Sequence, residues 1–194
     1  MTVSIESDSD RNTYEVWKQE QASSCGVASI WMARGLVKQQ CIDEDEWPLA
    51  QRVFSGAVRG AMNAAGGDRF PVCYNPGAFP KNQSSMGSTF SQFGLFSSQV
   101  ATGLQNEGLH ANFIGAQSIN PVNLGPGKAV IAFVRWRPAG NGAHFVCAAR
   151  MANNGAVVFL DPWDGKVNEQ WNNGTYAARY GGVGDILQVI NVWR

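Results

Sequence analysis

Hydrophobic residues in the first part of the chain recur at the three- and four-residue spacing of amphipathic helices. A helix is predicted from Cys25 to about Lys38, which contains the apolar or helix-favouring residues Val27, Ala28, Ile30, Trp31, Ala33 and Val37. A second helix is predicted from Pro48 to about Ala64, because proline suits a first helical turn and an apolar stripe follows it. A third, shorter helix is expected from about Ser97 to Glu107, before Gly108.

The second half of the chain has the pattern of β-strands. Short, largely apolar runs alternate with segments rich in glycine, asparagine and proline. The predicted strands are residues 109–114, 129–136, 143–150, 156–161 and 186–193. Helices followed by strands predict an α+β fold, in which N-terminal helices pack against a C-terminal antiparallel β-sheet.

Two segments depart from these patterns. Residues 1–12 are polar, and we expect them to be frayed and flexible. Residues 65–96 are rich in Gly, Ser, Asn and Pro and predict a long irregular loop insertion, of a length that is often functional. A chain of 194 residues suits one domain that buries about 70% of its unfolded surface, so residues 1–194 are predicted to form a single domain.

The net charge and the hydropathy of the chain argue against some classes of partner. Lys+Arg and Asp+Glu both number 15, and this zero net charge argues against a nucleic-acid partner, which normally requires a basic surface. No stretch approaches the roughly 20 apolar residues that span a bilayer, so no membrane association is expected. The first residues lack the basic and apolar regions of a secretory signal. We therefore expect a cytoplasmic protein, one delivered into a target cell by a signal-independent route, or a domain of a longer chain.

Cysteines and histidines bear on redox state and metals. Without an export signal, free thiols are expected at all four cysteines: Cys25, Cys41, Cys73 and Cys147. No C-x2-C or H-x3-H spacing occurs, so neither a zinc site nor any other metal or organic cofactor is predicted. Of the two histidines, His110 follows a predicted helix end and is expected at the surface.

The segment around Cys25 carries the strongest chemical signal. A cysteine that opens a helix lies at the positive end of the macrodipole, among backbone N–H groups that favour a thiolate. Gln19, six residues earlier, is placed to donate to an oxyanion together with the Cys25 backbone N–H, although Gln21 is a nearby decoy. The alternative is that Cys25 is an unreactive buried helix residue, the usual state of a free cysteine.

His144 and Asp161 supply the base and the carboxylate that a cysteine nucleophile uses. If residues 151–154 form a four-residue hairpin loop, His144 lies directly opposite Asp161, at about 5 Å between Cβ atoms. A turn at residues 154–155 would instead displace Asp161. Asp164 is a second candidate for the orienting carboxylate. The alternatives are a core histidine bonded to the backbone and an aspartate that only starts a turn.

Three short motifs together resemble those of papain-like cysteine peptidases: Gln19-x5-Cys25-Gly26-x-Ala28, His144-Phe145-Val146 and Asp161-Pro162. Within that family the chain is most similar to the C39 type, the double-glycine leader peptidases of bacteriocin exporters. The resemblance covers roughly residues 14–165. It implies a papain-like fold with Gln19 as oxyanion-hole donor, Cys25 as nucleophile, His144 as base and Asp161 as orienter.

The chain also departs from that family. Ser24 stands where the family commonly has an aspartate. Leader peptidases are usually fused to a transporter, whereas this chain shows no membrane segment, and the segment 65–96 has the character of an insertion. These differences bear on the substrate and the biological role more than on the chemistry.

The resemblance implies a cysteine endopeptidase that cleaves protein or peptide substrates, with a small residue, glycine in particular, before the cut. A free-standing bacterial domain of this kind is typical of a delivered effector or toxin, and such toxins have an immunity protein that blocks the cleft. Two alternatives stay open. One is an amidohydrolase or transglutaminase-like acyl transferase with the same three groups. The other is a peptide-binding module without turnover.

Overall fold

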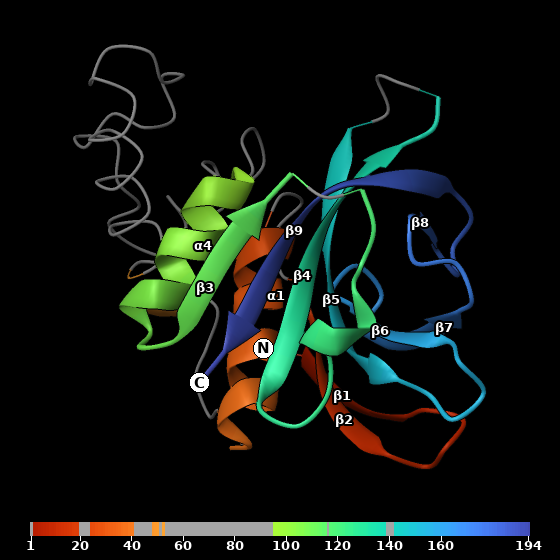
Figure 1. The fold of residues 1–194 in the computed structure, drawn as a ribbon, viewed down its shortest axis with the longest axis horizontal. Coiled ribbons are helices and arrows are strands. Elements are labelled where there is room, and N and C mark those ends of the chain that lie inside the picture. Colours follow the sequence, from red (N-terminus) through yellow and green to blue (C-terminus); the bar gives the residue numbers. More distant parts are fainter. Residues whose placement is uncertain are drawn as a thin grey trace.

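The fold packs helices against one large antiparallel sheet, as the α+β prediction requires (Figure 1). The structure is a computed structural model. It describes residues 2–19, 24–40, 48–50, 52, 95–115, 117–138 and 142–194. Figure 1 shows α1 behind the strands β9 and β4, α4 beside β3, and the β1–β2 hairpin next to β6 and β7.

Two of the predicted helices are confirmed. Helix α1 spans Cys25–Lys38 and ends where Gln39 adopts a left-handed backbone with φ 54°. Helix α4 spans Ser97–Asn106. Residues 48–50 and 52 are helical, at the start of the second predicted helix, and the remainder of that helix and most of the 65–96 segment lie outside the described residues. No helix in the described part of the chain is both long and apolar enough to cross a bilayer.

The large sheet has seven strands within the described residues, and all its pairings are antiparallel. The strands are β3 His110–Ile114, β4 Lys128–Trp136, β5 Ala143–Met151, β6 Val157–Asp161, β7 Lys166–Gln170, β8 Thr175–Ala177 and β9 Val183–Trp193. Their order is β3-β9-β4-β5-β6-β7, with β8 paired to β9, and the 3-10 turn η3 at Pro121–Asn123 precedes β4. The five predicted strands are confirmed, whereas β7 and β8 were not predicted.

The expectation that residues 1–12 are flexible is wrong for most of that segment. Strand β1, Thr2–Ser7, pairs along its whole length with β2, Thr13–Lys18. Polar side chains then fasten this hairpin to β7: Lys166 Nζ donates to Glu6 Oε1 at 2.5 Å, and Ser9 Oγ donates to Glu169 Oε2 at 2.7 Å. A polar strand at the protein surface shows little apolar alternation, which is why the sequence did not reveal it.

Two hydrophobic clusters lie on the two faces of the sheet. Because side chains alternate along β5, Phe145 and Cys147 pack toward α1, whereas Val146 packs on the opposite face with Phe159 and Tyr176. Strands β4 and β5 are buried on both faces, so they read as nearly continuous apolar runs. The sheet curls around the second cluster, because β8 pairs with β9 while a side-chain hydrogen bond joins β7 to β8.

Candidate active site

Cys25 is the first residue of α1 and is 8% exposed. The first turn of α1 holds no acidic residue, so no side chain of that turn offsets the positive end of the helix beside the thiol. Because Gly26 has no side chain, the backbone of α1 can lie close to Leu95 and Val100. A Cβ atom at position 26 would lie 3.2 Å from Leu95 Cδ1 and 3.3 Å from Val100 Cγ2. The start of α1 therefore packs tightly against the start of α4.

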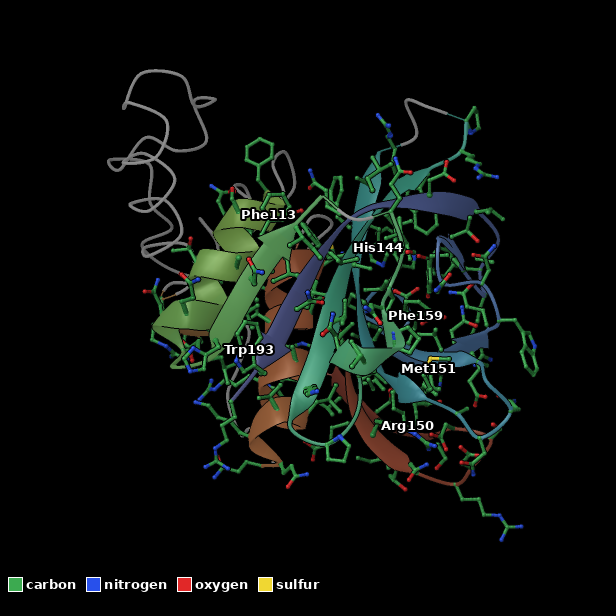
Figure 2. The ribbon with its side chains drawn as sticks, viewed as in Figure 1. Phe113, His144, Arg150, Met151, Phe159 and Trp193 are labelled. Carbon is green, nitrogen blue, oxygen red and sulfur yellow. The ribbon has the colours of Figure 1, made fainter. Side chains whose placement is uncertain are left out.

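His144 and Asp161 form a buried hydrogen-bonded pair. The distance from His144 Nε2 to Asp161 Oδ1 is 2.7 Å, and the two residues are 3% and 1% exposed. His144 lies near the beginning of β5, and Figure 2 shows it toward the opposite end of the sheet from Arg150. The contact proposed from the sequence is therefore present.

The hairpin register used to predict that contact is wrong. Met151 pairs with Val157, and the register shifts between Ala148 and Arg150, so the strands do not close on a four-residue loop at 151–154. Extending the observed pairing places Asp161 across from residue 146 and diagonal to His144. Diagonal neighbours on one sheet face remain within reach of long side chains, so the pair still forms.

Both carboxylate oxygens of Asp161 are hydrogen-bonded. Oδ1 also accepts from the Trp163 backbone N–H at 2.8 Å, and Oδ2 accepts from the Tyr176 hydroxyl at 2.5 Å. Burial alone would raise the pKa of Asp161, but the bond and charge of His144, together with the bonds from Tyr176 and Trp163, hold this pKa below its ordinary value. Asp161 is therefore an ionised carboxylate in a nearly water-free position.

Asp164 does not take the orienting position. Its Oδ1 accepts from the Lys166 backbone N–H at 3.1 Å, an interaction within the turn that follows β6. Burial and the nearby charge of Asp161 raise the pKa of Asp164. Of the two candidate carboxylates, Asp161 is the one that contacts His144.

Cys25 acts on the same imidazole. Burial lowers the pKa of His144, but the hydrogen bond that the ring donates to Asp161, followed by the hydrogen bond with Cys25 and its charge, outweighs burial and raises this pKa to about 10. Because Nε2 already faces Asp161, Nδ1 is the ring nitrogen left for the sulfur. Cys25 and His144, 119 positions apart in sequence, thus meet in one site.

Gln19 follows directly after β2 and is fixed next to the Asp161 turn. Its backbone N–H donates to the Pro162 carbonyl at 2.7 Å, and Pro162 follows Asp161 in sequence. The glutamine is therefore anchored close to the carboxylate that holds His144. Residues 20–23, which connect Gln19 to Ser24 and include the decoy Gln21, lie outside the described residues. The oxyanion role of Gln19 stays a prediction.

Aromatic rings surround the imidazole. The Trp136 ring stacks on His144 with centroids 5.7 Å apart and planes at 21°, and Trp163 meets it edge-on at 6.4 Å. Tyr180 lies 5.9 Å from Trp163, and burial and the charge of Asp161 raise the pKa of Tyr180. Neither Trp136 nor Tyr176 was identified from the sequence, because tryptophan and tyrosine in strands usually signal packing alone.

The remaining sequence candidates lie elsewhere. Cys147 is a buried free thiol in the cluster beside α1, and Cys41 and Cys73 lie outside the described residues. His110 is exposed and stacks on Trp193 at 5.6 Å, which confirms its expected place at the surface. Among the described side chains, no three His, Cys, Asp or Glu residues gather as ligands of a metal ion.

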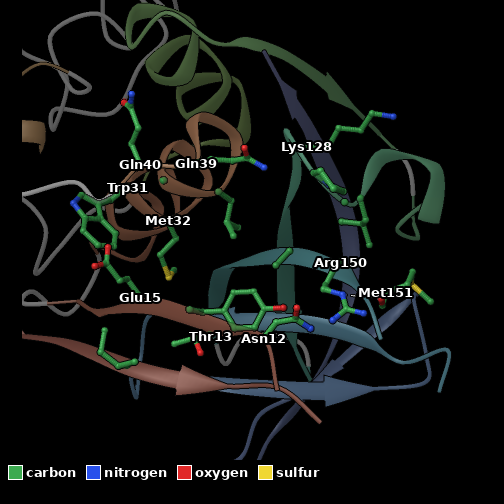
Figure 3. Close-up of a pocket in the computed structure, with 18 of the residues that line it drawn as sticks. Asn12, Thr13, Glu15, Trp31, Met32, Gln39, Gln40, Lys128, Arg150 and Met151 are labelled. Atoms are coloured by element: carbon green, nitrogen blue, oxygen red, sulfur yellow. Dashed lines mark hydrogen bonds between the residues drawn. The ribbon is translucent and has the colours of Figure 1, made fainter. Parts of the chain in front are cut away.

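A cavity of about 830 Å³ opens at the other end of α1 (Figure 3). In Figure 3, Met32 of α1 and Gln39, which directly follows α1, border it on one side, Thr13 of the hairpin lies below, and Arg150 and Met151 of β5 lie opposite. A 14-residue helix is about 20 Å long, so this cavity is separate from the Cys25 end of α1.

No family model matches this chain, and no curated protein matches it. The papain-like identity accordingly stays a prediction from the motifs. What bears on function is the geometry itself, a thiol at a helix start beside a buried histidine–carboxylate pair.

Proposed function

We propose that this protein is a cysteine endopeptidase of the papain-like type, with Cys25, His144 and Asp161 as its catalytic triad. The observation that carries the proposal is the position of the His144 ring. Its Nε2 lies 2.7 Å from the buried Asp161 carboxylate, and the same ring forms a hydrogen bond with Cys25. A thiol, an imidazole and a carboxylate in this order are the groups that acyl transfer through a thioester requires.

The reaction follows from the positions of these groups. The Cys25 thiolate attacks the carbonyl carbon of a peptide bond, and the Gln19 side-chain amide with the Cys25 backbone N–H stabilises the oxyanion. The His144 imidazolium gives its proton to the departing amine, which leaves a thioester on Cys25. Water then attacks the thioester as His144 takes its proton, and the acid product leaves with the thiolate restored.

Electrostatics support the assignment of the imidazole as a charged group. With a pKa of about 10, His144 is an imidazolium at neutral pH, and the ionised Asp161 balances it. Because both side chains are almost fully buried, their interaction is screened far less by water and salt than a surface pair would be. A charged imidazole is also the form that can give a proton to the departing amine.

The proposed substrate is a protein or peptide chain. The residues on either side of Cys25 in sequence, Ser24 and Gly26, are both small, a pattern that suits the approach of a peptide main chain to the sulfur. By resemblance to the double-glycine peptidases, glycine is proposed before the cut. By the same resemblance, the protein is proposed to be a bacterial effector or toxin, active in the cytoplasm of a target cell and blocked by a cognate immunity protein.

The test compares new protein N-termini in a bacterial lysate treated with wild type, Cys25→Ala or Cys147→Ala. Cys147 is the matched control, because it is a buried free thiol that does not belong to the site. Wild type and Cys147→Ala are expected to produce the same new N-termini, and Cys25→Ala none. Cleavage that persists in Cys25→Ala would refute the proposal. Amine incorporation without new N-termini would assign the same triad to an acyl transferase.

A further inference from the structure

Tyr176 is a fully buried tyrosine whose hydroxyl contacts the site carboxylate. It lies in the short strand β8, is 0% exposed, and donates to Asp161 Oδ2 at 2.5 Å. Burial and the negative charge of Asp161 raise the pKa of Tyr176 well above its ordinary value, so the phenol keeps its proton and remains a donor.

Packing fixes the direction of this hydroxyl. The Tyr176 ring meets Phe159 at 5.2 Å with planes at 66° and lies 6.2 Å from Trp136. Its strand is held by pairing with β9, where Tyr176 faces Gly184. A side chain at Gly184 has no room, since a Cβ atom there would lie 2.7 Å from the Arg135 carbonyl oxygen. The backbone of β9 therefore stays close to β4, and β8 is held in register beside it.

The second oxygen of Asp161 determines how the first one is presented. Oδ1 receives His144 Nε2 and the Trp163 N–H, Oδ2 receives the Tyr176 hydroxyl at 2.5 Å, and the Tyr180 side chain also forms a hydrogen bond with this carboxylate. With donors on both oxygens, the carboxylate cannot rotate without breaking a bond in a buried place, which is costly. Removal of the Tyr176 phenol would take this buried donor away from Oδ2 and weaken the hold that keeps the carboxylate turned toward the imidazole.

We propose that Tyr176 is a positioning residue of the site, which acts through Asp161 and His144 by fixing the Asp161 carboxylate so that Oδ1 meets His144 Nε2. This inference rests on the proposed peptidase function. Tyr176 is not proposed to touch substrate. Its effect reaches Cys25 only through a chain of contacts, which runs from Tyr176 to Asp161, His144 and finally Cys25.

The titratable groups that face Asp161 determine the direction of the expected pH effect. They are His144 from β5, Tyr176 from β8, Tyr180 from the turn after β8, and Asp164 from its own turn, with Cys25 of α1 beyond His144. The bond from Tyr176 helps to keep Asp161 ionised. Without this bond, burial raises the pKa of Asp161, so that the support of Asp161 for the imidazolium is lost at a higher pH.

The experiment measures the rate at which iodoacetamide alkylates Cys25 between about pH 4 and about pH 9, by mass spectrometry of the Cys25 peptide. Tyr176→Phe is compared with Tyr14→Phe. Tyr14 is a matched control, because its buried hydroxyl donates to the Asp8 carboxylate at 2.7 Å in the N-terminal hairpin. Thermal unfolding of both variants is measured in parallel.

Tyr176→Phe is expected to alkylate about tenfold more slowly than wild type at mildly acid pH, with its acid limb shifted upward by roughly one pH unit, whereas Tyr14→Phe keeps the wild-type profile. Replacing Tyr176 with para-aminophenylalanine restores a donor and should restore that profile. Should Tyr176→Phe fail to fold, the para-amino variant still tests the proposal, because a folded para-amino variant with slow alkylation would contradict it.

The outcomes separate this inference from the proposed function. If Cys25 of the wild type reacts no faster than the other thiols at mildly acid pH, the proposed function fails. If wild-type Cys25 is reactive and folded Tyr176→Phe has the same profile, Tyr176 has no positioning role and the peptidase proposal stands. Equal loss of reactivity in Tyr176→Phe and Tyr14→Phe would assign Tyr176 a purely structural role and also overturn the inference.

Discussion

His144 shows how opposing effects are settled at a single residue. Burial removes water from the ring and disfavours its charged form, yet a carboxylate on one nitrogen and a thiol on the other reverse that preference. The consequence is a charge at neutral pH in a position where an isolated histidine would be neutral. Because Asp161 is the strongest of the groups that raise the pKa of His144, it is the residue whose removal is most informative.

Asp161→Asn is expected to lower the pKa of His144 from about 10 toward or below the ordinary value of 6.5, since burial then opposes Cys25 alone. A raised pKa keeps the imidazolium up to about pH 10, so its loss moves the alkaline limit of cleavage to lower pH. NMR titration of the two histidine rings measures this, with His110→Gln used to assign the signals. Asp164→Asn is the control from the same turn.

An unchanged His144 titration in Asp161→Asn would show that the carboxylate does not control the imidazole. An equal shift in Asp164→Asn would show that the effect arises from the general charge of the turn. Only a shift confined to Asp161→Asn agrees with the direct 2.7 Å contact.

Most of the secondary-structure elements that are buried in the core could be predicted from the sequence, but β2 was missed although Tyr14, Val16 and Trp17 are buried. Helix α1 and strands β4 to β6 have strong apolar patterns because each packs against the core. Strands β1, β7 and β8 are short and partly exposed, so their pairing depends on neighbours that a sequence pattern does not reveal. The shift in register between β5 and β6 is likewise a tertiary feature, and it made the predicted hairpin geometry wrong.

The residues of the candidate site also divide into those that could be predicted from the sequence and those that could not. Cys25, His144 and Asp161 were identified because their chemistry and spacing are distinctive, and the structure brings these three together. Tyr176 and Trp136 were missed, since their contribution depends on where β8 and β4 lie in the folded sheet. Reactive groups can therefore be proposed from sequence more readily than the groups that orient them.

The turn between β6 and β7 joins two parts of the site and offers a test at the level of an element. Its Gly165 has φ +71°, and a Cβ atom there would lie 3.0 Å from Lys18 Cβ. The same turn holds Gln19 through the Pro162 carbonyl. We expect Gly165→Ala to lose about 1–2 kcal/mol of unfolding free energy and to slow cleavage, because the hairpin must move and takes Gln19 with it.

Gly155→Ala is the matched control for this prediction. Gly155 also has a positive φ, of 87°, but a Cβ atom there would have only an ordinary 3.6 Å contact with Trp171. Urea unfolding should show a comparable loss from the backbone in both variants, while only Gly165→Ala slows cleavage. Full activity in Gly165→Ala would show that hairpin placement does not govern the site.

For the whole molecule, the site depends on docking of the N-terminal hairpin. Strand β2 leads directly into Gln19, so the position of the hairpin sets the position of the proposed oxyanion donor. Arg150 at the end of β5 holds the far side of this hairpin, with bonds of 2.9 Å to Asp8 Oδ2 and 2.6 Å to Asp10 Oδ2. The Asp8 side chain is fully buried, whereas that of Arg150 is 23% exposed.

Arg150→Met is expected to cost about 2 kcal/mol of unfolding free energy, because it leaves the buried Asp8 carboxylate without its cation. Burial alone raises the pKa of Asp8, but bonds from Tyr14 and Asn12 and the charge of Arg150 hold it below 3.8. A depressed carboxylate pKa contributes stability above 3.8 that is lost as pH falls through the folded value. Without Arg150 the pKa rises, so acid unfolding should begin at a higher pH. Arg137→Met is the control, because it breaks the exposed ion pair with Asp185 and should leave the unfolding midpoint unchanged. A similar loss of unfolding free energy in both variants would contradict a special role for the contact between Arg150 and the hairpin.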